Sequence, residues 1–201
     1  MIKTVIFDIG GVITHTDFEA TYRNFGSRIG VSPDLVLKYC HENFKQLILG
    51  SLSFEDFCSE MRKSGADASL DLKQVLIEEM SKVRKIDEAV LETIRLLRKN
   101  YSVGTLTNLT ESRFITDEAT GLYTHFDYRV LSYVEHMEKP NPTFYQIALD
   151  RAGVMAEEAV FVDDTEKCIL AAQSMGMKTV HFADNVQLVE ELGKCGVVIN
   201  T

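Results

Sequence analysis

The sequence predicts an α/β fold in which a parallel sheet carries helices on both faces and a helical segment is inserted after the first strand. Three observations support this prediction. Short runs rich in β-branched residues recur along the chain, single helical patterns separate the later runs, and residues 15–85 hold helical patterns without a strand pattern. Strands that alternate with single helices require the crossover connections that build parallel sheets.

Six runs have the composition of strands that are buried on both faces. The first run, KTVIF, is too short and too soon interrupted by Asp8 to be a signal peptide or a membrane span, so we expect a cytoplasmic protein. The six predicted strands are residues 3–7, 102–106, 128–132, 159–162, 178–182 and 196–199.

Four helices are predicted in the second half of the chain, each with a recognisable end. Asn141 followed by Pro142 is typical of a helix start, and Gly153 is typical of the end of the same helix. The other three patterns begin at Asp87, span residues 165–175 and begin at Asp184. These helices would connect the strands and cover both faces of the sheet.

The inserted segment holds four patterns of helical period, and Ser32 and Ser53 are expected to cap two of them. The patterns span residues 18–29, 33–48, 54–63 and 70–83. We therefore expect a core made of residues 1–14 and 86–201 and a helical cap made of residues 15–85. Ligands of open α/β sheets bind at the carboxyl ends of the strands, so this cap would form a roof over such a site.

The composition excludes several classes of protein. The 201 residues include 21 Lys and Arg against 30 Asp and Glu, a net charge of −9 that argues against a partner made of nucleic acid. A content of 45% hydrophobic and 25% charged residues is that of a globular protein with a core. The cysteines show no spacing typical of a zinc site or a disulfide framework, so we expect small core residues at Cys40, Cys58, Cys168 and Cys195.

Polar residues follow four of the predicted strands. They are Asp8, the pair Thr107 and Asn108, Lys139, and the pair Asp163 and Asp164. The carboxyl ends of parallel strands meet at one edge of the sheet, so we expect these side chains to lie together.

This set of side chains indicates a particular chemistry. Three carboxylates at one edge repel one another unless a hard cation lies among them, and oxygen ligands of this kind suit Mg²⁺. A lysine opposite the cation makes the site attractive to a phosphate group. An ionised aspartate at such a site can attack phosphorus and form an aspartyl-phosphate that water then cleaves.

These motifs resemble those of the haloacid dehalogenase superfamily. They are FDIGGV around Asp8, TLTN ending in Asn108, Lys139 before Pro140, and VFVDD followed by a helical pattern that ends in MGM, and together they cover most of the chain. The resemblance implies a Rossmann-like parallel sheet core with an inserted four-helix cap domain of the first cap class. The most similar branches are small sugar-phosphate phosphatases and the amino-terminal phosphatase domain of epoxide hydrolases.

The resemblance also implies the ligands of the metal ion. Asp8 and Asp164 would bind Mg²⁺ directly, and the backbone carbonyl of Gly10 would be a third ligand. Asp163 would act through water or as a partner of the direct ligands.

The same resemblance assigns the groups that act on the substrate, a small phosphorylated metabolite. Asp8 would be the nucleophile, and Lys139 would pair with the nucleophile and the phosphoryl charge. Thr107, Asn108 and Gly11 would contact the phosphate. The implied function is that of a Mg²⁺-dependent phosphatase acting on a phosphomonoester such as a sugar phosphate, with the oligomeric state left open.

Gly10 departs from the usual pattern of the family. Most phosphatases of the family have a second aspartate at this position, a general acid that protonates the leaving oxygen, and proton transfer of this kind contributes about 10²- to 10⁴-fold in rate. His15 and Asp17 are the nearest groups in sequence that could replace this acid. The enzyme would also need no general acid if its leaving group departs without a proton.

The loss of this acid keeps other functions open. One alternative is a weakly active or non-catalytic phosphate-binding protein, and another is a phosphonate or C–X bond hydrolase of the same superfamily. A phosphonate hydrolase would need a cap lysine, for which Lys38 and Lys45 are candidates. Asp163 and Asp164 argue against a halide substrate because dehalogenases use no Mg²⁺, and the missing carboxylate argues against a phosphomutase.

Overall fold

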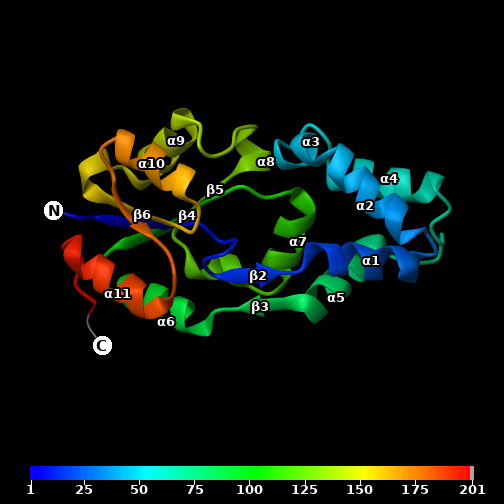
Figure 1. Cartoon of the computed structure of the whole chain (residues 1–201), viewed down its shortest axis with the longest axis horizontal. Coiled ribbons are helices and arrows are strands. Elements are labelled where there is room, and N and C mark those ends of the chain that lie inside the picture. Colours follow the sequence, from blue (N-terminus) through cyan, green and yellow to red (C-terminus); the bar gives the residue numbers. More distant parts are fainter. Residues whose placement is uncertain (200–201) are drawn as a thin grey trace.

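The computed structural model of the chain describes residues 1–199 and consists of two lobes joined by a narrow two-stranded ribbon (Figure 1). The sheet lobe contains a five-stranded sheet with the strand order β5-β4-β1-β6-β7, and every neighbouring pair is parallel. The strands are β1 (Thr4–Phe7), β4 (Ser102–Thr107), β5 (Tyr128–Leu131), β6 (Ala159–Asp163) and β7 (Lys178–His181). The predicted α/β class is confirmed.

Side chains of the central strand β1 alternate between the two faces of the sheet. Val5 and Phe7 pack into one core cluster, and Ile6 packs into another. Helices α6 (Glu88–Leu97) and α11 (Asn185–Lys194) cover the first face. Helices α9 (Pro142–Ala152) and α10 (Glu166–Ser174) cover the second face. Both faces are therefore buried, as the apolar composition of the strands requires.

The ribbon between the lobes corrects one expectation. Strand β2 (Thr14–Thr16) pairs antiparallel with β3 (Arg84–Ile86), although we expected no strand between residues 15 and 85. Strands of three residues are too short to show a periodicity of two.

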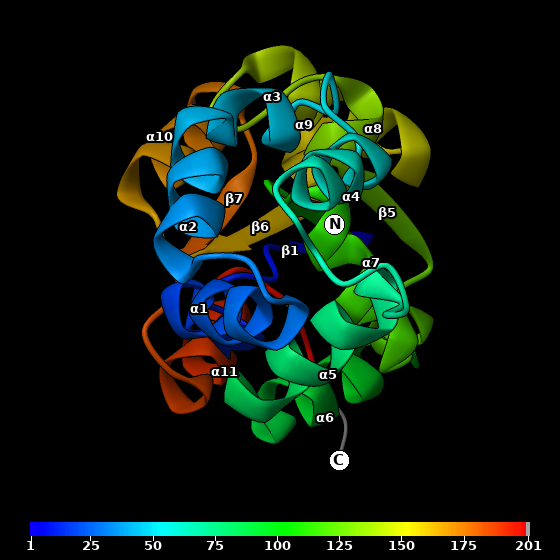
Figure 2. The same ribbon diagram turned by 90° about the vertical axis from the view of Figure 1, so that its right-hand side faces the viewer.

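The segment between the two ribbon strands forms the helical lobe, which has a core of its own and faces the carboxyl ends of the sheet (Figure 2). It contains α1 (Phe18–Ile29), α2 (Pro33–Glu42), α3 (Phe44–Ile48), α4 (Phe54–Lys63) and α5 (Leu72–Val83).

Two helices of this lobe differ from their predicted bounds. The helix expected over residues 33–48 is interrupted at Asn43, whose backbone leaves the helical region and whose side-chain amide donates to the Tyr39 carbonyl at 2.9 Å. The last helix begins at Leu72 instead of residue 70, because the carboxylate of Asp71 caps it.

Helix α7 (Glu111–Ala119) follows β4 and was not predicted. Thr110 caps this helix by accepting a hydrogen bond from the Arg113 amide at 3.3 Å, and Glu111 lies in the first turn. This cap and this acidic residue are a signal that sequence analysis could have used. The short elements α8 (Ser132–Glu135), Leu122–His125 and Ala156–Glu158 were also not predicted.

The strand predicted over residues 196–199 is wrong. Val197 is buried in the core, but its amide donates to the Leu192 carbonyl and so closes the end of α11. The amide of Val198 donates to the Tyr101 hydroxyl at 2.8 Å. These two bonds replace the pairing that a sixth strand would have made.

The four cysteines are free thiols and are buried or half-buried, as predicted. Across residues 1–199, the helices are too short or too polar to cross a bilayer. A location in the cytoplasm stays a prediction.

A buried ion network ties the ribbon to the sheet lobe. Arg84 at the end of the ribbon lies 3.0 Å from Asp117 on α7, and Arg113 lies 3.6 Å from the same carboxylate. Burial is the largest effect on both partners of the first pair, since it raises the pKa of Asp117 and lowers the pKa of Arg84. The pair is costly to bury, and breaking it costs more.

We expect the substitution Asp117→Ala to lower the free energy of unfolding by about 3–5 kcal/mol, because it leaves two buried guanidinium groups without a carboxylate. Urea denaturation measures this change. Glu92→Ala, which removes an exposed partner of Arg95, is the control and should leave the stability nearly unchanged. Equal stabilities of the two variants would contradict the role of the network.

Candidate active site

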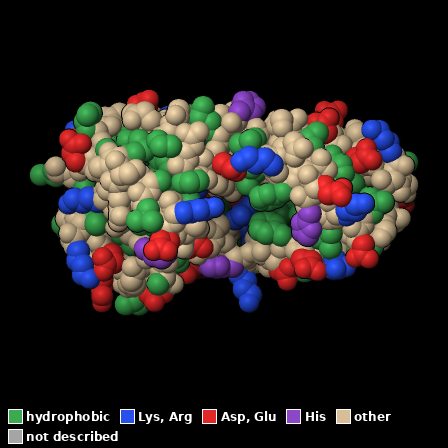
Figure 3. Space-filling model, turned by 45° about the horizontal axis from the view of Figure 1, so that its top comes forward, with side chains coloured by type: hydrophobic (Ala, Val, Ile, Leu, Met, Phe, Trp, Pro, Cys, Tyr) green, Lys and Arg blue, Asp and Glu red, His purple; other side chains and the backbone are tan. Residues whose placement is uncertain are grey.

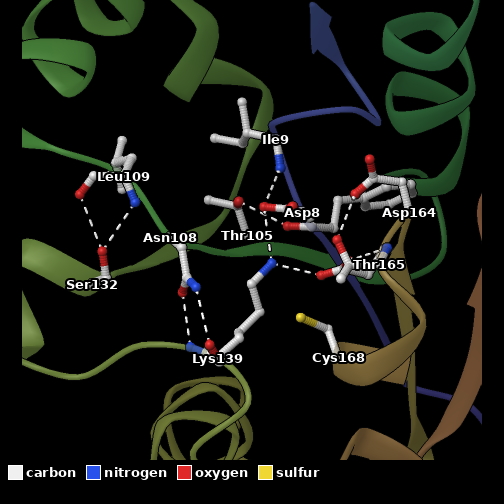
Figure 4. Close-up of polar contacts among 12 residues, drawn as sticks. Asp8, Ile9, Thr105, Asn108, Leu109, Ser132, Lys139, Asp164, Thr165 and Cys168 are labelled. Atoms are coloured by element: carbon white, nitrogen blue, oxygen red, sulfur yellow. Dashed lines mark hydrogen bonds and ion pairs between the residues drawn. The ribbon is translucent and has the colours of Figure 1, made fainter. Parts of the chain in front are cut away.

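Four residues predicted to form the site converge at the carboxyl ends of the central strands, namely Asp8, Asn108, Lys139 and Asp164 (Figure 4). Asp8 follows β1 and Asp163 ends the neighbouring strand β6, where Phe7 pairs with Val162. This register places the two carboxylates side by side. Lys139 lies on the loop before α9 and points at both of them.

Lys139 is buried and bridges the two carboxylates. Its Nζ lies 3.0 Å from Oδ1 of Asp8 and donates to Oδ2 of Asp163 at 2.6 Å. Burial alone lowers the pKa of this lysine, but the attraction of Asp8 and Asp163 is stronger in sum, so the pKa is raised. Lys139 is therefore a fixed positive charge at the centre of the site.

The pKa of Asp163 is also raised, which disfavours the charged form of a carboxyl group. Burial is the largest cause that raises its pKa, and repulsion by Asp8 adds to it against the attraction of Lys139. The single ammonium of Lys139 is shared by the carboxylates of Asp8 and Asp163, so it cannot neutralise both of them. Asp163 is 0% exposed, and its second oxygen accepts from the Thr165 amide at 2.8 Å.

The chemistry of these oxygens fits a magnesium ion. Carboxylate oxygens of Asp8, Asp163 and Asp164 lie within 4.8 Å of one another. Three carboxylates against the single ammonium of Lys139 leave a net charge of −2, which favours binding of a divalent cation. Both oxygens of Asp163 already have protein partners, whereas Asp164 is exposed. This difference supports a direct ligand at Asp164 and a supporting role for Asp163.

Gly11 allows Asp164 to approach the first strand. Its φ of +79° lies in the left-handed region, and a Cβ atom at this position would lie 1.9 Å from Oδ2 of Asp164. The Gly11 amide donates to the Thr14 carbonyl at 3.0 Å. The contact of Gly11 with a phosphate stays a prediction.

Asn108 holds the backbone of Lys139. Its side-chain amide donates to the Lys139 carbonyl at 3.1 Å, and its side-chain oxygen accepts from the Lys139 amide at 2.8 Å. Sequence analysis missed this role, and the predicted contact of Asn108 with a phosphate stays a prediction. The neighbouring Thr107 is buried at the end of β4.

Arg113 occupies the space beside Gly10. A Cβ atom at Gly10 would lie 3.0 Å from Nη1 of Arg113, and the same guanidinium donates to Oγ1 of Thr14 at 2.7 Å. A guanidinium stays protonated and cannot replace a general acid. The position of the usual second aspartate therefore faces a fixed positive charge.

A cavity of about 490 Å³ opens over Asp8 and Lys139. The proposed replacement acids do not line it: His15 is exposed on β2, and the carboxylate of Asp17 caps α1 by accepting from the Ala20 amide at 2.9 Å. The cavity is instead lined by Lys45, one of the two candidate cap lysines, and by residues that sequence analysis did not place in the site, namely Phe44, Ile48, Glu138, Thr165, Lys167 and Cys168.

Residues 2–176 match the model of the haloacid dehalogenase-like hydrolase family. The chain belongs to this family. It is therefore a hydrolase, and Asp8, Asn108, Lys139 and Asp164 all lie within the matched residues.

Known proteins resemble this haloacid dehalogenase-like hydrolase along most of its length. It is 28% identical to a D-ribitol-5-phosphate phosphatase of Bacteroides thetaiotaomicron over 96% of this chain and 97% of that protein. It is 25% identical to bifunctional epoxide hydrolase 2 of Rattus norvegicus over 96% of this chain, which spans 38% of that protein. A crystal structure of a HAD family enzyme from B. thetaiotaomicron with magnesium and inorganic phosphate has the same fold, with a TM-score of 0.71 and 22% identity over 90% of this chain and 93% of that chain.

We expect Lys139→Met to lower the free energy of unfolding by about 3–5 kcal/mol in buffer with EDTA, because Asp163 stays buried without a counter-ion. Denaturation by urea measures this loss. Lys167→Met, at an exposed residue that lines the same cavity, is the matched control. If both variants are as stable as the parent, Lys139 does not hold the two carboxylates together.

Proposed function

We propose that this hydrolase is a Mg²⁺-dependent phosphatase that cleaves a small phosphomonoester through an aspartyl-phosphate intermediate. The observation that carries the proposal is the buried Lys139 between Asp8 and Asp163, with Asp164 beside them. The similarity to the D-ribitol-5-phosphate phosphatase and to the enzyme crystallised with magnesium and phosphate supports it.

Asp8 acts as the nucleophile in this proposal. One of its carboxylate oxygens forms a bond to phosphorus while the bond from phosphorus to the leaving oxygen breaks. Water then attacks the phosphorus of the aspartyl-phosphate, releases inorganic phosphate and restores the Asp8 carboxylate. Lys139 orients Asp8 through the contact at 3.0 Å and stabilises the negative charge on the phosphoryl group.

The metal would be held by Asp8, Asp164 and the backbone carbonyl of Gly10, with Asp163 in support. When bound, Mg²⁺ neutralises the carboxylates and attracts the phosphate oxygens. Asp163 holds Lys139 and is itself fixed by the Thr165 amide, so its part is to keep the lysine in place.

The leaving oxygen receives no proton from a side chain at position 10. The Arg113 guanidinium beside Gly10 supplies positive charge, and in this proposal the proton comes from water in the cavity. This arrangement favours leaving groups that are stable as anions, such as phenols. His15 and Asp17 stay predictions as replacement acids, since neither lines the cavity.

One observation favours a second candidate function, hydrolysis of a phosphonate through an imine. Lys45 of the helical lobe lines the catalytic cavity and pairs with Glu138, whereas Lys38 is exposed and lies 3.8 Å from Glu42. Borohydride treatment with a phosphonoaldehyde labels an imine-forming enzyme covalently. Labelling that Lys45→Met abolishes would favour this function over the phosphatase.

We expect Asp8→Asn to lower kcat for phenyl phosphate by about 10³-fold or more, because the amide is a poor nucleophile. Asp34→Asn, at an exposed residue of the helical lobe, is the control and should keep the parent rate. EDTA should abolish the activity and added Mg²⁺ should restore it. A parent enzyme no faster than Asp8→Asn would indicate a phosphate-binding protein without turnover.

Gly10→Asp should not increase kcat, because the new carboxylate would pair with Arg113 and stay ionised. We expect a loss of several-fold and no new acidic group in the pH dependence of kcat. The double variant Gly10→Asp with Arg113→Met, compared with Arg113→Met alone, tests whether the guanidinium is the cause. A tenfold gain from Gly10→Asp alone would contradict this account.

A further inference from the structure

A second cavity of about 250 Å³ lies beside the catalytic cavity, between the helical lobe and the loop after β4. The walls of the two cavities share Phe44, Ile48 and Asn108. A molecule whose phosphate lies at Asp8 can therefore extend into the second cavity. Figure 3 shows hydrophobic side chains gathered in the hollow between the two lobes, next to basic side chains.

Most of the second cavity is lined by carbon. Burial raises the pKa of the Cys40 thiol to about 12, so this residue is neutral and acts as a small apolar group. Phe44 is 56% exposed and Phe18 is 38% exposed, although both are large hydrophobic residues. The further apolar residues of the wall are Tyr22, Leu37, Leu47 and Leu109.

Most polar side chains of the wall, His41 excepted, already have a partner inside the protein. The hydroxyl groups of Tyr22 and Ser112 lie 3.2 Å apart, and those of Thr110 and Ser112 lie 2.7 Å apart. Glu19 pairs with Arg23, Arg113 donates to Thr14, and Asn108 binds the backbone of Lys139. His41 is exposed.

Because most polar side chains of the wall already have partners, the cavity favours apolar groups over sugars and polyols. A sugar or polyol in the second cavity would lose its hydration and find few free donors or acceptors in the wall, which costs free energy for every unpaired hydroxyl. An apolar group would bury carbon against Phe18, Leu37 and Leu47 and gain free energy for every methylene. An apolar cavity of about 150 Å³ already holds a benzene ring, so this one has room for a substituted ring.

We propose that the second cavity binds the leaving group, and that the preferred substrates are phosphate esters of apolar alcohols, above all substituted phenols, rather than sugar phosphates. This inference rests on the proposed phosphatase function. It also agrees with Gly10, since a phenol leaves without a strong protein acid.

The test uses phenyl phosphate, 4-ethylphenyl phosphate and 4-butylphenyl phosphate with the parent enzyme and Mg²⁺. The acidity of the leaving phenol hardly changes along this series, so differences report on binding of the alkyl group. We expect kcat/KM to rise along the series by up to about 10²-fold, because each fully buried methylene contributes about fourfold. Ribitol 5-phosphate should have a higher KM than 4-butylphenyl phosphate.

A binding measurement separates this inference from catalysis. Calorimetry with ethylphosphonate and hexylphosphonate should show tighter binding of the longer chain and a negative heat-capacity change. Equal dissociation constants would overturn the inference even if the enzyme is an active phosphatase.

Variants of α2 test whether the second cavity is the one that binds the alkyl group. Leu37→Trp fills the second cavity and should lower the ratio of kcat/KM for 4-butylphenyl phosphate over phenyl phosphate by tenfold or more. Leu35→Trp, at a residue on the same helix that is 41% exposed and does not line the cavity, is the matched control and should keep the parent ratio. Circular dichroism establishes that both variants fold, and if Leu37→Trp does not, the phosphonate titration of the parent decides.

The outcomes distinguish this inference from the function on which it rests. Failure to hydrolyse any of the phosphate esters would contradict the phosphatase. Hydrolysis of phenyl phosphate with a flat dependence on chain length, or with a preference for ribitol 5-phosphate, would overturn only the apolar substrate class.

Discussion

The ammonium of Lys139, buried between Asp8 and Asp163, is the interaction on which the site depends. Three neighbouring strands contribute to it. Strands β1 and β6 bring the two carboxylates side by side through their register, and the residue after β4, Asn108, holds the lysine backbone. Each strand end alone is an ordinary polar turn. Together they form an acidic cluster whose charge is only partly compensated by the protein, which is the electrostatic condition for holding a divalent cation.

The residues at the sheet edge could be predicted from the sequence because the signal for each of them lies in a few neighbouring residues. A buried run followed by Asp8 or Asp163 indicates a strand with a polar end, and parallel pairing then places these ends together. The same reasoning could not predict Arg113, because this residue is far from Gly10 in the sequence. It also lies on α7, a helix that sequence analysis did not predict. The pairing of Asn108 with Lys139 was missed because side-chain partners depend on rotamers, which spacing does not encode.

The two lobes contribute side chains of different chemistry to the cavities. The sheet lobe contributes the charged and hydrogen-bonding groups, whose positions are set by strand register. The helical lobe contributes Phe18, Leu37 and Phe44, which form a wall without a fixed pattern of donors. Affinity for a ligand at the sheet lobe depends on the distances from these charged and hydrogen-bonding groups. At the helical lobe it depends on the area that a ligand buries, which tolerates variation in shape.

The two-stranded ribbon has a consequence for the evolution of this architecture. Thr14 pairs with Ile86, so the chain leaves the sheet lobe and returns to it at adjacent points. The whole insertion is therefore attached to the sheet lobe in the way that the loop of a hairpin is attached to its two strands. An insertion anchored in this way can be lengthened, shortened or exchanged while the strand order of the sheet is preserved. Changes in the helical lobe can thus alter which ligands fit while Asp8, Lys139 and Asp163 of the sheet lobe keep their positions.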